Sequence, residues 1–365
     1  MLIYLASNYY VIKNVYKALV RLTPAWLAWT IVLILAILSL CIILSFVARN
    51  IESNKNLKMI INTAAAYWMG LFAFLLMSFL AKDLILLLLK LIGMKVRSIR
   101  PVMAWVALLI ALVISATGFI SAGHVYMRDY TLDLVKVDPG HGLRIALISD
   151  LHLGAIESEK RLPDIISKVN STHPDLVVIA GDVFDDDFDK IKDPSAVEKS
   201  LRSLNSTYGT YATLGNHDRG QSFPSMLALL ENSQVTLLNE EATLIDDKFE
   251  LIGRLDPRTP NVAGVGSRGH MSDLTYEKDK TIIVVDHDPG HYQEYENIDL
   301  LLSGHTHHGQ IFPGNLITDL IYRVSYGHKY LEDKGFAHIV SSGTGTWGPP
   351  MRVGSRNEVV VVDIK

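Results

Sequence analysis

Long apolar runs fill the first third of the chain, and none of them contains a charged side chain. They cover residues 24–48, 59–81 and 101–122. At about 1.5 Å per residue, a helix of this length crosses the roughly 30 Å hydrocarbon core of a bilayer. Three such runs in succession are too long and too numerous for buried core helices or a cleaved signal peptide. The pattern predicts three transmembrane helices.

Two flanking segments leave alternatives open. Residues 2–20 carry four tyrosines and two lysines between apolar positions, which fits an interfacial helix as well as an additional span. Leu84–Leu89 can extend the second run or lie along the interface. The number of spans is therefore three or four.

Beyond residue 123 the pattern changes to short runs rich in Val and Ile, separated by turns and helical stretches. We expect helices at 158–170, 194–205 and 222–232, and strands at 143–149, 176–180, 210–214, 249–253, 281–285, 300–303, 338–342 and 358–364. Strands and helices alternate early, and strands dominate late. This order predicts a layered α/β domain over 138–365, joined to the apolar segment 1–123 by a linker at 124–137.

The net charge of the chain also changes sign at residue 123. Residues 1–123 hold 11 Lys and Arg against two acids, a net of +9, which leaves −13 for the remainder, where all 13 His lie. The segments 13–23 and 82–100 carry eight basic residues and the loop 49–58 only three, so the positive-inside rule places the first two in the cytoplasm. Three crossings later the acidic domain emerges on the extracytoplasmic side. The sequence predicts a multi-pass cell-membrane protein.

The same composition excludes some functions. A net charge of −13 argues against nucleic acid as a partner, because duplex binding needs a basic surface. The one cysteine, Cys41, lies in an apolar run, so the acidic domain has no thiolate nucleophile and no cysteine-based zinc site.

Metal-ligand residue types follow five of the predicted strands. The blocks are Asp150-Leu151-His152, Gly181-Asp182, Gly215-Asn216-His217-Asp218, Asp286-His287-Asp288-Pro289 and Gly304-His305-Thr306-His307. Ligands in α/β sheets bind beyond the carboxyl ends of the strands, so we expect these blocks to converge on one site.

In this order the blocks DLH, GD, GNHD, HDP and GHTH resemble the calcineurin-like metallophosphoesterase superfamily, over about residues 143–365. The longer string LLLSGHTHHGQIFP is similar to a bacterial membrane-anchored subgroup with N-terminal transmembrane helices. The resemblance implies an α-β-β-α sandwich with two mixed sheets. His308 departs from it, because the subgroup has Gly there, and could contact substrate or support the site.

The resemblance also implies residue roles. Asp182 would bridge two divalent ions, and His217, oriented by Asp218, would act near the leaving-group oxygen. The O and N donors suit Mn, Fe, Zn or similar ions without selecting among them, and a bridging hydroxide would attack phosphorus in line. By family correspondence, one metal would be held by Asp150, His152 and His307, and the other by Asn216, His287 and His305.

Other polar residues support weaker predictions. Residues 341–346 read as a structural turn, because a phosphate-binding loop would carry a Lys. We expect a solvated acidic loop at Asp185, Asp186, Asp187 and Asp189, and surface or core histidines at His270, His291, His328 and His338. An arginine could bind phosphate through its guanidinium group. The sequence favours none of the four candidates, Arg254, Arg258, Arg268 and Arg352.

The function expected from sequence is a membrane-anchored dimetal phosphohydrolase acting on a phosphomonoester or phosphodiester. A lipid-linked substrate is attractive because the anchor holds the site at a bilayer. Two alternatives remain: a diphosphatase of the UDP-diacylglucosamine type on the cytoplasmic face, and a non-catalytic membrane module for binding or transport. The complete ligand set favours the enzyme. The sequence does not indicate protein partners.

Overall fold

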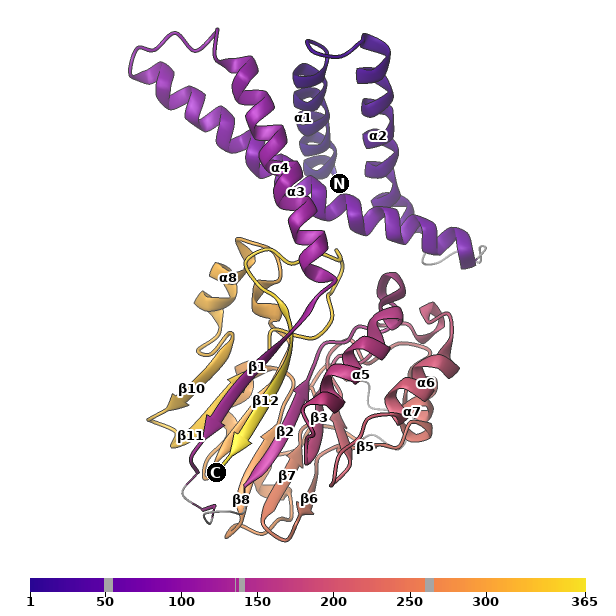
Figure 1. The fold of residues 1–365 in the computed structure, drawn as a ribbon, viewed down its shortest axis with the longest axis vertical. Helices are drawn as coiled ribbons and strands as arrows, with labels where there is room; N and C mark the ends of the chain where they lie inside the picture. The colour runs from indigo at the N-terminus through magenta and orange to yellow at the C-terminus, as the bar shows by residue number, and fades with distance from the viewer. Residues whose placement is uncertain (49–54, 135, 138–141, 260–265) are drawn as a thin grey trace. The chain divides into compact units, whose positions relative to one another are not determined.

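The computed structural model describes residues 1–48, 55–134, 136–137, 142–259 and 266–365. The chain forms two compact units, Met1–Ile120 with Gly348–Met351, and Ser121–Trp347 with Arg352–Lys365 (Figure 1). Most of the loop 49–58 lies outside the described residues. The predicted start of the α/β domain at Asp138 also lies outside them.

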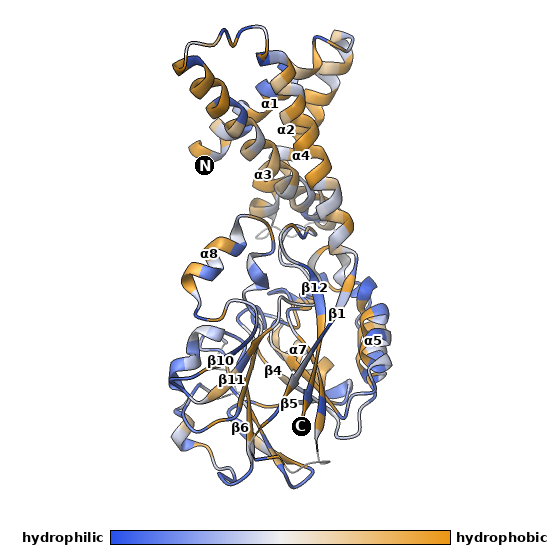
Figure 2. Ribbon diagram, turned by 60° about the vertical axis from the view of Figure 1, so that its left-hand side comes forward, coloured by the Kyte–Doolittle hydropathy of each residue, from blue (hydrophilic) through white to orange (hydrophobic). Residues whose placement is uncertain are grey.

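The first unit is helical. It is built from α1 (Leu2–Leu19), α2 (Ala25–Ala48), α3 (Lys55–Leu91) and α4 (Arg100–Ala122), whose last two residues belong to the second unit. Within the described residues, three helices are long and apolar enough to cross a membrane: Ala25–Val47, Asn56–Leu91 and Arg100–Ala122. Their apolar side chains colour α2, α3 and α4 mostly orange in Figure 2. These are the three runs expected from sequence, and α1 is not among them.

A polar cluster explains why α3 continues past its predicted end. Lys82 is 3 % exposed and donates a 2.6 Å hydrogen bond to Asn14 Oδ1 of α1. Its neighbour Asp83 accepts a 2.5 Å hydrogen bond from the Tyr10 hydroxyl, also on α1. Because α1 satisfies both charged groups, the helix runs on through Leu84–Leu89 to 37 residues, about 55 Å.

The second unit contains two mixed six-stranded sheets. The order in the first is β1-β12-β2-β3-β4-β5 and in the second β10-β11-β9-β8-β7-β6. The first sheet comprises β1 (Val125–Leu132), β12 (Asn357–Ile364), β2 (Leu143–Ile148), β3 (Leu176–Ala180), β4 (Thr210–Thr213) and β5 (Val235–Leu237). The second comprises β10 (Gly327–Leu331), β11 (Phe336–Val340), β9 (Leu300–Ser303), β8 (Thr281–Val285), β7 (Phe249–Gly253) and β6 (Glu241–Ile245).

Apolar side chains fill the layers on both faces of each sheet. Between the sheets, β2, β3 and β12 meet β7, β8 and β9 through residues such as Leu147, Val178 and Ile283. The other face of the first sheet packs on α5 (Leu162–Ser171), α6 (Pro194–Arg202) and α7 (Phe223–Asn232). The outer face of the second sheet is covered by Tyr295, Ile298 and their neighbours. The two predicted mixed sheets are confirmed.

Element boundaries differ in two instructive places. The helix predicted at 158–170 is a 3₁₀ helix, Ala155–Arg161, followed by α5. The new helix begins at Leu162, and Pro163 fits its first turn because proline has no N–H to donate. The segment 124–137, expected to be a linker, contains β1, which pairs in parallel with β12 over eight residues. That linker prediction was wrong for 125–132, because these residues form an edge strand of the first sheet.

Candidate metal centre

All the predicted ligands lie in the second unit, where they follow the ends of five strands. β2, β3 and β4 are parallel neighbours in the first sheet, and β8 and β9 are parallel neighbours in the second. Their carboxyl ends therefore point to a common edge of the sandwich. The residues that follow them are Asp150, His152, Asp182, Asn216, His287, His305 and His307.

Three of these residues form a first group of donors. Asp150, His152 and His307 each place one ligand atom within 4.8 Å of the others. His307 Nε2 lies 3.3 Å from Asp150 Oδ1 and 3.1 Å from His152 Nε2. All three side chains are buried. This is the set expected for one metal.

A second group lies beside the first. Asp182, His287 and His305 also place ligand atoms within 4.8 Å of one another. Asp182 Oδ2 lies 3.2 Å from His287 Nε2 and 3.7 Å from His152 Nε2. One carboxylate oxygen is thus close to nitrogens of both groups, which is the position that a bridging ligand takes.

Unpaired buried atoms test whether these groups suit a cation. His287 Nδ1 lies 2.8 Å from the Ala180 carbonyl oxygen, to which it must donate, so neutral His287 has a lone pair on Nε2 facing Asp182. Among the described residues, neither His287 Nε2 nor Asn216 Oδ1 finds a hydrogen-bond partner. Buried acceptors that face each other are stabilised by a proton or a metal cation between them. The donor set therefore fits divalent metal ions, without selecting one metal.

The pKa values show where a proton takes the place of a cation when no ion is bound. Although burial opposes it, the Asp182 carboxylate raises the pKa of His287 well above its usual value, and His287 in turn holds the pKa of Asp182 low. Burial, followed by the Arg352 guanidinium, depresses the pKa of His307, and burial also lowers that of His305. His305 and His307 are thus favoured in the neutral form that binds metal, whereas a cation beside Asp182 would have to displace the proton of His287.

Strained backbone also marks this cluster. Five of the seven predicted ligands have positive φ: Asp150 (53°), His152 (47°), Asp182 (50°), His305 (71°) and His307 (49°). Such conformations cost about 1–3 kcal/mol each and persist where the surroundings hold them in place. Gly181 is required beside them, since its φ is 76° and a Cβ would lie 2.5 Å from His287 Nδ1.

His217 stands at the edge of the metal groups, and its partner differs from the one expected. His217 Nδ1 lies 3.1 Å from Asp186 Oδ2, and Arg219 Nε donates to the other oxygen of Asp186 at 2.9 Å. Asp218 does not touch the imidazole. Its two carboxylate oxygens instead accept 2.8 Å hydrogen bonds from the backbone N–H groups of Phe184 and Gly215. The expectation that Asp218 orients His217 was wrong, because Asp218 points into the protein and fixes the loops.

The acidic loop after β3 has more specific roles than the expected solvated surface. Besides Asp186, it brings Asp185 Oδ1 to 3.5 Å from His152 Nδ1, on the opposite side of the ring from the first donor group. Carboxylates placed in this way orient a ligand imidazole and increase its basicity. The crowding of acids after Gly181-Asp182 was the only sequence signal for these two residues.

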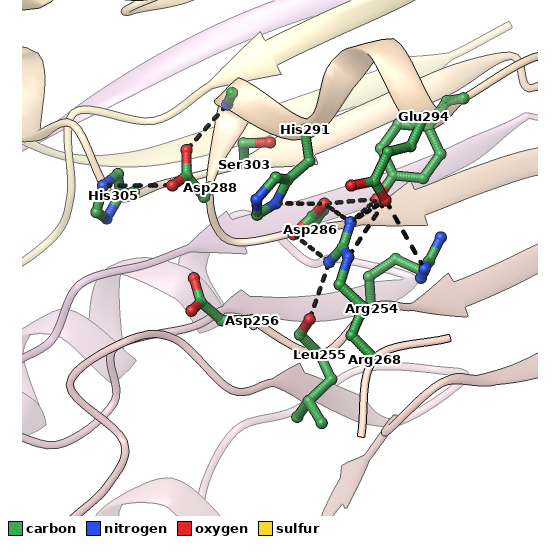
Figure 3. Close-up of polar contacts among 12 residues, drawn as sticks. Arg254, Leu255, Asp256, Arg268, Asp286, Asp288, His291, Glu294, Ser303 and His305 are labelled. Carbon is green, nitrogen blue, oxygen red and sulfur yellow. Dashed lines mark hydrogen bonds and ion pairs between the residues drawn. The ribbon is translucent and has the colours of Figure 1, made fainter. Parts of the chain in front are cut away.

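The four arginines considered as phosphate clamps are engaged in the structure. Arg352 is 1 % exposed and donates to the carbonyl oxygens of His307 at 2.8 Å and Gly345 at 2.7 Å. It therefore supports the His307 loop from behind. Arg268 forms a 2.8 Å ion pair with Asp286, the residue directly before His287 (Figure 3). Arg254 pairs with Glu240, and Arg258 with Asp256 and Asp288.

Asp288 and Asp286 flank His287 and face different partners. Asp288 Oδ2 lies 3.7 Å from His305 Nε2 (Figure 3). Asp286 is fully buried, and besides Arg268 it meets His291 Nδ1 at 3.3 Å and the Tyr295 hydroxyl at 2.5 Å. This network holds the strand end that presents His287.

His308 lies outside both donor groups. Its ring stacks on Tyr326, with 4.4 Å between the centroids and an interplanar angle of 13°. The turn at 341–346 is buried and hydrogen-bonds to the end of β2, with Thr344 N donating to the Ser149 carbonyl at 2.8 Å and Gly345 N to the Asp150 carbonyl at 3.0 Å. It is the structural turn predicted from sequence.

A cleft of about 300 Å³ gives access to the donor groups. It is wide enough for a phosphate group with some of its substituent. Its lining combines ligand-type residues with small or polar residues and one large aromatic ring: Asp182, His217, His305, Thr306, His307, Gly309, Gln310 and Trp347. Asp182, His217 and His305 thus face the space that a substrate can enter.

Known proteins with related sequences carry the same type of domain. The calcineurin-like phosphoesterase family matches residues 143–309. A metallophosphoesterase of Aquifex aeolicus is 31 % identical over 70 % of this chain and 98 % of its own length. The chain belongs to the metallophosphoesterase family. This membership makes it a phosphoesterase hydrolase and agrees with the two groups of metal-ligand residues.

Two further relatives extend the comparison, and one of them is named as a transmembrane protein. A metallophosphoesterase of Campylobacter jejuni, called uncharacterized, is 28 % identical over all of this chain and 96 % of its own length. A transmembrane protein with a metallophosphoesterase domain from Danio rerio is 30 % identical over 71 % of this chain and 62 % of its own length. With three apolar helices of its own, this metallophosphoesterase is a membrane-associated protein.

Proposed function

We propose that this metallophosphoesterase is a membrane-anchored, two-metal hydrolase of phosphomonoesters or phosphodiesters. The observation that carries the proposal is Asp182 Oδ2, which lies within 3.7 Å of nitrogens from both donor groups and faces an open cleft. One ion would be held by Asp150, His152 and His307, the other by Asn216, His287 and His305, with Asp182 shared. When bound, the two ions supply positive charge for the phosphate oxygens and lower the pKa of water.

The chain's own residues supply the remaining chemistry. His217 lines the cleft, and with Asp186 at Nδ1 its Nε2 is the nitrogen left to give a proton to a leaving oxygen. The backbone N–H of His217 donates to Asp182 Oδ1 at 2.8 Å, so the proton donor and the shared ligand move as one unit. No protein nucleophile is required.

The substrate and the side of the membrane belong to the same proposal. The basic segments near the apolar helices favour an extracytoplasmic hydrolase domain, which favours an envelope phosphate ester with a lipid moiety over a cytoplasmic nucleotide-linked lipid. The acidic charge of residues 124–365 argues against nucleic acid. The complete ligand set argues against a module that only binds or transports.

The test uses the full-length protein in detergent or nanodiscs, with bis-p-nitrophenyl phosphate and p-nitrophenyl phosphate as substrates. We expect hydrolysis after addition of Mn²⁺ and none in excess chelator. Asp182→Asn should lower turnover by about two orders of magnitude or more and reduce bound metal measured by mass spectrometry. Asp189→Asn, a carboxylate of the acidic loop outside both donor groups, is the matched control and should change neither. Full activity of Asp182→Asn would refute the proposal.

A further inference from the structure

The short helix α8 (Gly314–Ile321) exposes its apolar side chains. None of its residues is buried. The exposed fractions are 51 % for Leu316, 55 % for Ile317, 87 % for Leu320 and 68 % for Ile321. Figure 2 shows orange segments in α8 beside its blue and white ones. A helix that faces only water does not carry four large aliphatic side chains in this way.

The apolar side of α8 faces away from the domain, and its polar side faces toward it. Leu316, Ile317, Leu320 and Ile321 follow i, i+1, i+4, i+5 spacing and form one face of the helix. The polar residues lie on the opposite side, where Asp319 accepts a hydrogen bond from the Ser325 hydroxyl. The helix is therefore attached through its polar side, and each large side chain of its apolar side is more than half exposed.

The apolar surface continues to the mouth of the cleft. Gly309 and Gln310, which line the cleft, precede α8 by a few residues. Gln310 fixes Trp347 on the rim through two hydrogen bonds to its backbone, of 2.7 and 2.8 Å. Trp347 is 53 % exposed, and Phe312, between Gln310 and α8, is 46 % exposed. We call Phe312, Trp347 and the four aliphatic residues of α8 the apolar rim.

The apolar rim lies near the point where the chain leaves α4. The Ala122 carbonyl, at the end of that apolar helix, accepts 2.6 Å hydrogen bonds from Asn357 Nδ2 and Arg161 Nη1. Three residues before Asn357, Gly354 sits against α8, with its Cβ position 3.7 Å from Asn315 Oδ1. Three residues span at most about 10 Å. The start of α8 is therefore close to the residue at which the proposed membrane span ends.

We propose that the apolar rim inserts into the phospholipid surface of the bilayer, so that the cleft opens where lipid phosphate groups lie. The proposal rests on the membrane anchoring in the proposed function. Proximity to Ala122 favours lipid as the occupant, because Ala122 is the last residue of an apolar helix long enough to cross a bilayer and belongs to the same unit as α8. A short helix with an apolar outer face and a flanking Trp and Phe is typical of interfacial insertion.

The experiment places a fluorescent reporter on the full-length protein in a Cys41→Ser background, which removes the one native cysteine. Leu320→Cys labelled with an environment-sensitive nitrobenzoxadiazole dye is reconstituted in vesicles of phosphatidylcholine and phosphatidylglycerol. We expect a blue-shifted emission and quenching by doxyl-labelled lipid. Lys199→Cys on α6, a surface helix away from the apolar rim, is the control and should show water-like emission without lipid quenching.

A second variant tests the cause of insertion. Leu316→Asp with Ile317→Asp, on the same helix face, should return the Leu320 reporter to the emission and quenching of the Lys199 control. Hydrolysis of bis-p-nitrophenyl phosphate should stay unchanged, because neither side chain lines the cleft. Water-like emission at Leu320 in the parent would overturn the inference, as would crosslinking of Leu320→Cys between two copies without lipid quenching. Because the readout needs no turnover, an inactive but lipid-quenched protein would refute only the proposed hydrolase function.

Discussion

Asp186 and Asp218 stand on either side of His217 and have different tasks. Asp186 is partly exposed and contacts the imidazole, whereas Asp218 is fully buried and binds two backbone N–H groups. Burial and the nearby Asp182 carboxylate raise the pKa of Asp218 to about 7, while Asp186 has a lowered pKa through His217 and Arg219 despite its partial burial. One carboxylate contacts the proposed proton donor, and the other fixes the loop structure.

Paired substitutions separate these tasks. Asp186→Asn should lower kcat by about 10- to 100-fold with little change in melting temperature, because the imidazole loses the partner that orients it. Asp218→Asn should instead destabilise the protein by about 1–3 kcal/mol, since its amide group would face one of the two backbone donors. Steady-state kinetics and thermal unfolding check both. A kcat loss confined to Asp218→Asn, without destabilisation, would contradict this assignment.

Arg352 is a buried charged residue that holds the loop of His307 in place through hydrogen bonds. Arg352→Met should destabilise the unit by at least about 3 kcal/mol, because the carbonyl groups of His307 and Gly345 lose charged donors. Arg323→Met removes an exposed arginine that pairs with Asp333 and should leave the stability almost unchanged. Chemical denaturation of the two variants gives the comparison. Equal stability of both would show that the Arg352 contacts are dispensable.

The clustering of the candidate ligand residues could be expected from sequence because each closely follows an apolar strand. Asp186 and Arg352 could not, since their contacts join residues 31 and 45 positions apart and depend on the folded loops. A solvated acidic residue and a ligand-orienting one have the same local sequence pattern. The distinction arises only from tertiary placement.

At the level of elements, the strands buried on both faces were the easiest to predict. β3, β7, β8 and β9 are continuous apolar runs or nearly so, and the observed bounds match those expected. β1 was missed because VYMRDYTL is an edge strand with mostly exposed side chains, and so it lacks the apolar signal. β1 is recognised by its pairing with β12, and this pairing cannot be seen in a local sequence pattern.

The position of β1 predicts how the hydrolase unit can be cut. A fragment starting at Asp138 lacks β1 and leaves the long, Val-rich β12 as an open edge. We expect it to aggregate, because unpaired edge strands recruit other chains. A fragment starting at His124 keeps the pairing and should elute with less aggregate in size-exclusion chromatography. Equal behaviour of the two fragments would contradict the importance of β1.

At the scale of the whole molecule, the structure changes the charge argument for topology without reversing it. Lys82 and Lys90 lie within α3, so the connection between α3 and α4 is shorter than the predicted loop 82–100. Lys95 and Arg97 remain in it. These residues, with the basic segment before α2, still favour a cytoplasmic connection.

Reporter fusions test this orientation. Alkaline phosphatase fused after Lys365 should be active, because this reporter folds only outside the cytoplasm, and green fluorescent protein at the same position should be dark. The same reporters fused after Gly93, in the connection between α3 and α4, should give the opposite pattern. Fluorescence at Lys365 would place the hydrolase unit in the cytoplasm and revive the nucleotide-linked lipid substrate.

The pairing of β1 with β12 also constrains the order of synthesis and folding. β12 lies between β1 and β2 in the first sheet, although the chain makes β1 and β2 early and β12 only after residue 356. Asn357–Ile364 must therefore be synthesised before the first sheet can form completely. Until then β1 has no strand to pair with. Such long-range closure is slow and exposes an edge during biosynthesis. We expect this protein to depend on chaperones that hold nascent chains at the membrane.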